Sequence, residues 1–468
     1  LFGAIPGVSM LTLAAILLPF SAGLEPAQGV MLFAVIYCTG TYGGAITAIL
    51  FNIPGAPENA PTAFDGYPMT KKGMAGKAVG AAVLCSAVGG TASALLMMTA
   101  TEPLAHWAIR NIGPPEIFAL VFFGLAVASS VGGKTIWKGW MSVLLGLMIA
   151  TIGQDPVGGI NRYNFGLPDL AAGIAFVPAI LGFFAVSEIF IQAEKKAFGK
   201  YNAPKLNVDF PTFTELWAHK IAVLRSIIVG FFCGILPGIG ATLAAFMGYG
   251  EAVRWSKEKE KFGTGKLEGV ISSETANNAA TGAAMIPLLA LGLPGGALTA
   301  IMVAVFQFHD MEPGPLVFYN SPELIWVVFA AMFYANVSIL FIGLIETKTI
   351  LQLLRIPFTY LAPMILMLAS IGAYIGRGLV LDVVVMFGAG VLGFLLRRSG
   401  YSIAGIVLGI ILGKIGEQNF AQGMQMVHYD LIAYMSRPIC FILIIAGAIT
   451  LGTGVYRALA SNRALKNL

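Results

Sequence analysis

Residues 272–299 are the stretch of this sequence where hydrogen-bonding side chains interrupt a membrane-length apolar segment. They read SSETANNAATGAAMIPLLALGLPGGALT, so a polar start gives way to apolar residues and then to a Pro-Gly pair. Proline removes a backbone donor and glycine loosens the chain, so we expect a helix to stop near Pro294. Within a bilayer, freed backbone groups are tolerated only against protein or a water-filled cavity, and polar side chains there mark a solute path by default.

An earlier stretch, residues 41–55, has the same character and also ends in a Pro-Gly pair. We expect the two stretches to face each other and to hold a small solute. Uncharged amides suit this role because they donate and accept hydrogen bonds at a lower burial cost than charged groups. The expected solute-binding residues are Thr41, Tyr42, Gly43, Thr47, Asn52, Pro54 and Gly55 in the first stretch, and Asn277, Asn278, Thr281, Pro294 and Gly295 in the second.

Interrupted helices bind ions without needing charged side chains. A helix N-terminus binds anions such as carboxylates, whereas helix C-termini and unwound carbonyls, completed by Asn or Thr oxygens, bind Na⁺. Residues 43–55 and 282–295 are therefore candidates for re-entrant hairpins whose tips expose backbone amides. The alternative is that these glycines and prolines only permit tight packing. Four Pro-Gly pairs in symmetric positions, flanked by Asn and Thr, favour a site.

Glu274 is the most suggestive charged residue, and two interpretations of it stay open. It begins a helix at the membrane boundary, where its charge is favourable against the helix dipole, or it binds the coupling ion or carries a proton. No organic cofactor is expected, and no metal beyond Na⁺ as a coupling ion. The other residues assigned to the coupling ion belong to two further Pro-Gly pairs and are Pro6, Gly7, Pro237 and Gly238.

Enzyme and pump classes have little support in this sequence. It contains no HExxH, no GxSxG, no Walker lysine loop and no paired-carboxylate cluster. The four cysteines are scattered in apolar context without a CxxC pair, which is typical of small buried thiols. Lysines and arginines lie in loops between apolar runs, so the net charge of +5 indicates membrane topology and not nucleic-acid binding.

The elements that must position these residues are membrane helices. The chain has 468 residues, 57% of them hydrophobic and 11% charged, and apolar runs long enough to cross a bilayer recur from end to end. We therefore predict an all-α, polytopic transmembrane bundle of about 11–13 elements. A polar loop is expected at 58–77. The later spanning candidates lie near 78–100, 115–132, 139–153, 170–192, 323–345, 358–376, 379–396, 401–415 and 437–456.

The chain contains a weak internal repeat. FGAIPGVSMLTLAA (2–15) resembles CGILPGIGATLAAF (233–246), and three further matches follow in the same order, including PPEIFALVFF (114–123) with SPELIWVVFA (321–330). Two halves with paired interrupted helices are typical of transporters whose site lies between the repeats. We predict a membrane repeat at 1–192, a lysine-rich cytoplasmic linker at 193–220 and a second membrane repeat at 221–468.

Long segments of the sequence resemble the large membrane subunit of the tripartite tricarboxylate transporters, the TctA family. The most specific are residues 41–78, which include FNIPGAPENAPTAFDGYP, and residues 234–300, which include SSETANNAATGAAMIPLLALGLPGG. Residues 165–189 and 372–401 add support, so the resemblance covers nearly the whole chain. The sequence departs from the family pattern at its start, where relatives usually have a helix before the first Pro-Gly pair.

This resemblance implies ion-driven uptake of a carboxylate across a bacterial inner membrane. The implied partners are a small membrane subunit, a periplasmic solute-binding protein that delivers the carboxylate, and the lipid bilayer; a homodimer is also considered. Energy is expected from a Na⁺ or H⁺ gradient and not from ATP. The runner-up is a passive anion channel or pore subunit. Neither the carboxylate nor the choice between Na⁺ and H⁺ follows from the sequence.

Overall fold

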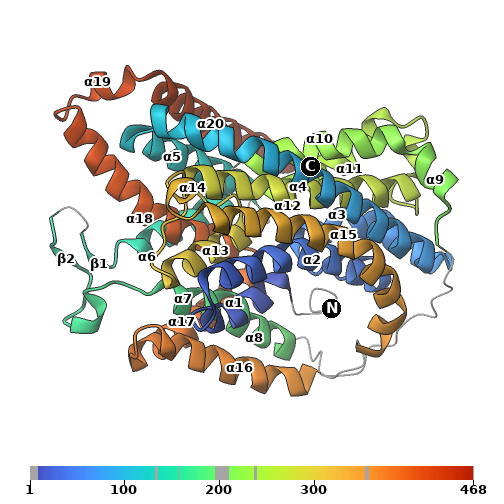
Figure 1. The fold of residues 1–468 in the computed structure, drawn as a ribbon, viewed down its shortest axis with the longest axis horizontal. Helices are drawn as coiled ribbons and strands as arrows, with labels where there is room; N and C mark the ends of the chain where they lie inside the picture. The colour runs from blue at the N-terminus through green and yellow to red at the C-terminus, as the bar shows by residue number, and fades with distance from the viewer. Residues whose placement is uncertain are drawn as a thin grey trace.

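The computed structural model describes residues 9–131, 135–155, 158–194, 210–236, 240–353 and 358–466 (Figure 1). The pairs Pro6-Gly7 and Pro237-Gly238, and most of the expected linker, lie outside the described residues. The described chain is almost entirely helical, with a single antiparallel pair of strands, β1 (Gly153–Gln154) and β2 (Asn161–Arg162). The predicted all-α fold class is confirmed.

Among the described residues, seven helical segments are long and apolar enough to cross a membrane. They are α2 (Pro26–Phe51), α4 (Ala75–Asn111), α15 (Pro322–Leu353), α17 (Val380–Arg398), α18 (Ile403–Met426), α20 (Pro438–Lys466) and the continuous run of α7 (Phe176–Ile180), η4 (Leu181–Val186) and α8 (Ser187–Glu194). Shorter apolar helices are α1 (Met10–Ser21), α5 (Pro114–Val131), α6 (Ile136–Ala150), α13 (Ala297–Phe308) and α16 (Phe358–Ile375). The chain is a multi-pass membrane protein, as predicted.

The other elements connect these helices or pack among them. The longer ones are α3 (Ala60–Lys71), α10 (Lys220–Ile235), α11 (Gly240–Trp255) and α12 (Leu267–Leu291). The short ones are η2 (Pro57–Asn59), η3 (Pro168–Leu170), α9 (Phe213–Ala218), η5 (Lys259–Lys261), α14 (Val317–Asn320) and α19 (Leu431–Met435).

Helix α12 lies at the centre of the molecule, with α4, α10 and α11 packed along it (Figure 1). Its residues from Glu268 to Ala290 are all buried. Glycines permit the close approach: a Cβ added at Gly89 of α4 would lie 2.4 Å from the carbonyl oxygen of Thr275. Small residues let helix backbones approach closely in membranes. The polar half of α12 is therefore enclosed by protein and not exposed to lipid.

Helices α2 and α12 end in the same backbone geometry. Asn52 follows α2 in the left-handed region at φ 56°, and Gly292 follows α12 at φ 73°. In each case the residue after the cap donates its N–H to the carbonyl six positions earlier, from Ile53 in the first half and from Leu293 in the second. The left-handed residue itself donates to the carbonyl four positions earlier, from Asn52 to Ala48 and from Gly292 to Leu288, which is the αL arrangement that ends many helices. The breaks expected before the two Pro-Gly pairs are thus present.

After each break the chain folds back onto the helix it has just left. The N–H of Gly55 donates to the carbonyl of Gly44 at 3.3 Å. A Cβ added at Gly295 would lie 2.7 Å from the carbonyl oxygen of Ala284, which shows a similarly close approach. In both cases the contacted residue lies eleven positions earlier in the chain. The two breaks are local counterparts, while the division at 1–192, 193–220 and 221–468 stays a prediction.

Two expectations about local structure differ from the fold. Helix α2 runs unbroken through Gly43 and α12 through Gly282, so these glycines lie inside helices and not at hairpin tips. The expected polar loop 58–77 contains helix α3, whose second residue is a proline. Proline is tolerated in the first turn because its missing N–H would have no intrahelical acceptor there. The polar residues of α3 are buried because other helices supply their partners, which local sequence does not reveal.

The remaining helices pack around this centre in several smaller sets. Helix α18 packs on α5 and α6, α20 packs on α5, and α17 packs on η4 (Figure 1). An ion pair joins the start of α5 to the start of α20, where Arg437 Nη2 donates to Glu116 Oε2 at 3.1 Å. The main apolar core includes residues from elements far apart in the chain, such as Phe33 of α2, Phe183 of η4 and Phe306 of α13.

Candidate functional site

A cavity of about 420 Å³ lies where the two breaks meet the ends of several helices. It is lined by residues 9–11, 55–58, 241–242, 296–298 and 400–404, and by Tyr37, Phe184 and Arg397. Described residues at or after the Pro-Gly pairs 6–7, 54–55, 237–238 and 294–295 contribute to this lining: 9–11, 55–58, 241–242 and 296–298. Segments that are far apart in the chain thus line the same cavity.

Helix N-termini dominate the lining of this cavity. Ser9 caps α1 by accepting the N–H of Thr12 at 3.1 Å, and Ser402 caps α18 by accepting the N–H of Gly405 at 3.1 Å. Gly296 precedes α13, and the first turn of α11 contributes Ala241 and Thr242. Each helix N-terminus carries partial positive charge and N–H groups without intrahelical acceptors. Such a convergence suits an anion.

Arg397 is the one cationic side chain among the described residues that line the cavity. Its Nη1 lies 2.6 Å from Glu188 Oε2 and 3.4 Å from Ser187 Oγ. The side chain is 34% exposed, so part of the guanidinium remains open beyond the ion pair. Arg397 therefore adds positive charge at the rim of the cavity while being held in place by α8.

A buried carboxylate site adjoins these elements on α12. Glu274 Oε1 accepts from Thr62 Oγ1 of α3 at 2.5 Å, and Oε2 accepts from Ser86 Oγ of α4 at 3.0 Å. Asn278 Nδ2 donates to Ser86 Oγ at 2.8 Å and lies 3.4 Å from Glu274 Oε2. The side chain of Asn59 in η2 is also within reach of this carboxylate. Three helices and η2 therefore surround one acid.

Glu274 is fully buried, and in the part of the chain that the structure describes it forms no ion pair with Lys, Arg or His. A buried ionised carboxylate is costly unless an opposite charge compensates it. Neutral hydroxyl and amide donors orient the group but do not cancel its charge. The charge of this carboxylate is therefore compensated only when a proton or a cation binds to it. No sequence motif indicated that the hydrogen-bond partners of Glu274 come from α3 and α4.

Unpaired amide oxygens lie near this carboxylate. Asn278 Oδ1, Asn59 Oδ1 and both polar side-chain atoms of Asn277 are buried without a hydrogen-bond partner among the described residues. Buried polar groups in proteins are nearly always paired, so each such atom calls for an explanation. Carbonyl-type oxygens are ligands that hard cations prefer. The three amide oxygens among these atoms have the chemistry of hard-cation ligands, whereas Asn277 Nδ2 is a hydrogen-bond donor.

The structure distributes the expected solute-binding residues of the first stretch over different surroundings. Gly55 lines the cavity and Pro54 precedes it in the break, whereas Asn52 is the left-handed cap. Four others lie inside α2. Thr41 and Thr47 hydrogen-bond to backbone carbonyls of their own helix, Tyr42 lies on a different, apolar groove between α2 and α15, and Gly43 is buried.

The expected solute-binding residues of the second stretch lie in two places. Pro294 and Gly295 are buried in the break that leads to the cavity residues 296–298. Asn277, Asn278 and Thr281 are buried on α12 outside the cavity lining, and of these Asn278 contacts Glu274. The structure thus brings Asn278 together with Glu274 and brings Gly55 close to the second break.

Several polar residues at these two sites were not predicted from the sequence to bind a solute or an ion. Glu58, Asn59 and Thr62 fell in the expected polar loop, and Ser86 and Arg397 were assigned to spanning and topology roles. A usable signal was the polar run PENAPT directly after Pro54-Gly55, which repeats the pattern of polar residues beside a break. Ser86 gave no signal, because single serines are common in membrane helices.

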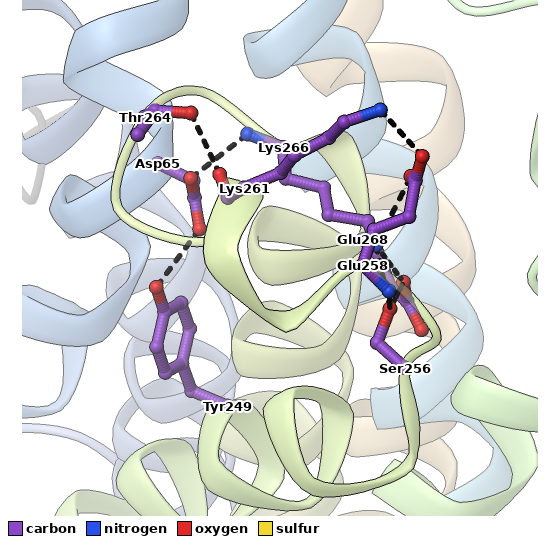
Figure 2. Close-up of polar contacts among 8 residues, drawn as sticks. All are labelled: Asp65, Tyr249, Ser256, Glu258, Lys261, Thr264, Lys266 and Glu268. Atoms are coloured by element: carbon purple, nitrogen blue, oxygen red, sulfur yellow. Dashed lines mark hydrogen bonds and ion pairs between the residues drawn. The ribbon is translucent and has the colours of Figure 1, made fainter.

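A second buried acid, Asp65, ties α3 to the loop before α12 (Figure 2). Its Oδ1 accepts the backbone N–H groups of Gly265 and Lys266 at 2.8 Å each, and its Oδ2 accepts from Tyr249 at 2.9 Å. Thr62 lies one turn earlier on the same helix. The Asp65 contacts therefore fix the helix that presents Thr62 to Glu274.

Ion pairs extend this anchor across the loop (Figure 2). Lys266 Nζ lies 3.1 Å from Glu268 Oε2 and donates to Ser256 Oγ at 2.6 Å. Lys261 hydrogen-bonds to Glu258 and lowers the pKa of that carboxyl. The loop between α11 and α12 is thereby ordered by its own side chains and by Asp65.

Comparisons with known proteins identify relatives along the whole chain. The family model described as "Tripartite tricarboxylate transporter TctA family" matches residues 1–408. An "Uncharacterized 52.8 kDa protein in TAR-I ttuC' 3'region" of Agrobacterium vitis is 36% identical over 454 residues, covering 96% of this chain and 89% of that protein. An "Uncharacterized protein in TAR-II ttuC' 3'region" of the same organism is 33% identical over 234 residues, covering 50% of this chain and 97% of that protein. No solved structure matches the chain.

Proposed function

Because this chain belongs to the tripartite tricarboxylate transporter TctA family, we propose that it is the large membrane subunit of a secondary transporter that couples uptake of a di- or tricarboxylate to Na⁺ or H⁺. Its partners in this proposal are a small membrane subunit and a periplasmic solute-binding protein that delivers the carboxylate. The membrane is the bacterial inner membrane, and a homodimer stays a prediction.

The observation that carries the proposal is the cavity lined by described residues from segments that follow four Pro-Gly pairs, at 9–11, 55–58, 241–242 and 296–298. Helix N-termini and the rim guanidinium of Arg397 supply positive electrostatic potential there, and the volume of about 420 Å³ is in the range of small-molecule sites. A carboxylate held by N–H groups needs no buried lysine. The breaks at 52–56 and 292–296 would let the chain on either side of the anion change its hydrogen bonding as the site opens to one face or the other.

The carboxylate site at Glu274 supports coupling to a cation. Moving one elementary charge across 100 mV is worth roughly 2.3 kcal/mol, so a trianion entering an inside-negative cell faces roughly 7 kcal/mol from the potential alone. More than three co-transported cations would make that uptake electrically favourable, and a dicarboxylate would need fewer. A buried acid without a cationic partner is a place for one of them, and Asn278 orients it.

The test is uptake in proteoliposomes that contain this subunit and its small partner, with the binding protein outside. ¹⁴C-labelled citrate, succinate and malate are offered with an inward Na⁺ gradient, an inward H⁺ gradient, or neither. Saturable uptake that depends on one gradient and on the binding protein is expected. Uptake that does not depend on either gradient would contradict ion coupling and support a passive channel. If none of the carboxylates is taken up, the proposed substrate class would be wrong.

Two variants locate the sites in the same assay. Ala297→Phe fills the cavity and should abolish uptake, whereas Ala448→Phe on an exposed face of α20 is the matched control and should not. Glu274→Gln should abolish accumulation against a gradient. Normal accumulation by Glu274→Gln would contradict its role in coupling.

A further inference from the structure

Glu58 is an acid inside the cavity proposed for an anion. It belongs to η2, directly after the first break, and is 5% exposed. It lines the cavity together with Tyr37 of α2 and Thr242 of α11, and it is close enough to Glu274 of α12 for the two acids to interact electrostatically. The charged or titratable groups that line the same cavity are Arg397, Tyr37 and Tyr401. Arg397 is paired with Glu188, so it is not the counter-ion of Glu58.

The position of Glu58 has a counterpart in the second half of the chain that carries no charge. Glu58 and Leu298 each lie three residues after the glycine of their Pro-Gly pair, Gly55 and Gly295, and both line the cavity. The two breaks share the same backbone geometry. Packing at this position is therefore satisfied by an apolar side chain in one half, and the acid in the other half needs a different explanation.

We propose that Glu58 is a proton carrier of the substrate cavity, neutral whenever the carboxylate occupies the cavity, so that each anion that crosses takes one proton with it on this residue. The inference deepens the proposed function and rests on it. The proton joins the Glu58 carboxylate from the side on which the anion enters. It leaves as H⁺ to the side on which the anion departs, which restores the carboxylate.

The physical reason is the confinement of two acids in one small space. Two negative charges a few ångströms apart in a low-dielectric site repel strongly, as paired carboxylates in proteins do. A protonated carboxyl instead donates a hydrogen bond to the anion. The ionised form also has a role, because Glu58 lies beside Thr242 in the cavity lining and faces the helix N-termini, which compensate its charge.

Glu58 also connects the cavity to the buried site on α12. Asn59, the next residue, donates from Nδ2 to the carbonyl of Thr41 at 2.9 Å and reaches Glu274. The short turn η2 thus has one side chain in the cavity and the next at the carboxylate of α12. Because Glu58 and Asn59 are neighbours in η2, a shift of this turn on a change of charge at Glu58 would also move Asn59 at the Glu274 site.

The test compares Glu58→Gln with wild type in the complete transport system, in proteoliposomes whose membrane potential is clamped by K⁺ and valinomycin. The probes are ¹⁴C-labelled citrate, succinate and malate. Steady-state accumulation is measured at several pH differences, and exchange of labelled for unlabelled anion is measured without a gradient. Glu323→Gln, an exposed acid at the start of α15, is the matched control.

In wild type the accumulation ratio should rise about tenfold per pH unit for each coupled proton. In Glu58→Gln that dependence should lose one factor of about ten per pH unit, because the amide mimics the neutral acid and cannot release a proton. Anion exchange should persist, which also shows that the variant is folded. Glu323→Gln should match wild type in both assays.

Two results would contradict the role of Glu58 without contradicting the proposed function. An unchanged dependence on the pH difference in Glu58→Gln would show that this residue carries no coupled proton. Loss of exchange together with accumulation would show that a neutral side chain at 58 does not suffice for anion binding. If the wild-type protein transports none of the three anions, the result would contradict the proposed function and therefore also this inference.

Discussion

Ser86 on α4 donates a hydrogen bond of 3.0 Å from its Oγ to Oε2 of Glu274 on α12, across 188 positions of the chain. The bond lies inside the helix pair where glycines bring the two backbones together. It provides a direct way to measure whether the acid at the centre of the molecule is charged, since hydrogen bonds to ionised groups are worth more than those to neutral ones.

Ser86→Ala should reduce the free energy of unfolding by about 1.5–3 kcal/mol if the acceptor is ionised. In a Glu274→Gln background the same substitution should cost only about 0.5–1.5 kcal/mol, because the remaining bond is neutral. Denaturant unfolding of the four proteins in detergent micelles gives this double-mutant cycle. Thr99→Val, which removes a hydroxyl bonded only within α4, is the control. Additive effects would mean that the Ser86–Glu274 bond contributes nothing.

Gly44→Ala should disturb the first break, because the added Cβ would lie 2.1 Å from Asn59 Oδ1. Overpacking of this kind typically costs about 1–3 kcal/mol, and here it also displaces η2 from the Glu274 site. Gly388→Ala on α17 meets nothing within 4 Å and should be neutral or slightly stabilising. Thermal unfolding in detergent, followed by size-exclusion chromatography, distinguishes the two variants. Equal melting temperatures would contradict the close approach at Gly44.

Asp65→Ala should loosen the loop between α11 and α12, because it leaves the N–H groups of Gly265 and Lys266 without their acceptor. Each unpaired buried donor costs about 1–3 kcal/mol. The readout is limited proteolysis with trypsin, which cleaves after the lysines of this loop. Cleavage should accelerate in Asp65→Ala, less in Tyr249→Phe, and little in Glu258→Gln, which removes an exposed ion pair and keeps every lysine of the loop. Equal cleavage rates in all three would show that Asp65 does not hold the loop.

Arg437→Gln should destabilise the protein more than Glu116→Gln does. Glu116 is 2% exposed, so removal of its partner leaves a buried charge, at a cost that reaches about 3 kcal/mol. Glu116→Gln leaves an arginine whose side chain is 37% exposed and can be hydrated, and the new amide can still accept from Gly113. Unfolding midpoints of the two variants in detergent test the order. The reverse order would show that the buried carboxylate finds another partner.

The two breaks were predictable from sequence because their causes are local. Proline lacks a backbone donor, glycine adopts left-handed conformations without strain, and both effects act within a few residues of Pro54 and Pro294. The helices end at Phe51 and Leu291, as that chemistry requires. The multi-pass helical class followed from composition for a similar reason, since the length of an apolar run is set by the thickness of a bilayer.

Helix α3 and the extent of α2 were not predictable in the same way. The segment 58–77 is polar, and polar residues between membrane spans usually lie in loops. Here Thr62 and Asp65 are buried because Glu274, Gly265 and Lys266 supply their partners. Those partners lie 200 or more positions away, so no local pattern records them.

The sequence by itself determined where helices break, which residues are available to bind an anion or a cation, and to which family the chain is similar. Only the tertiary structure decided how they assemble: it separated Thr41 and Tyr42 from the cavity, grouped Asn278 with Glu274, and brought Glu58 and Arg397 to the segments after four distant Pro-Gly pairs. The reason is that hydrogen bonding and charge compensation act through space over a few ångströms, whereas the residues that meet here are separated by up to hundreds of positions along the chain.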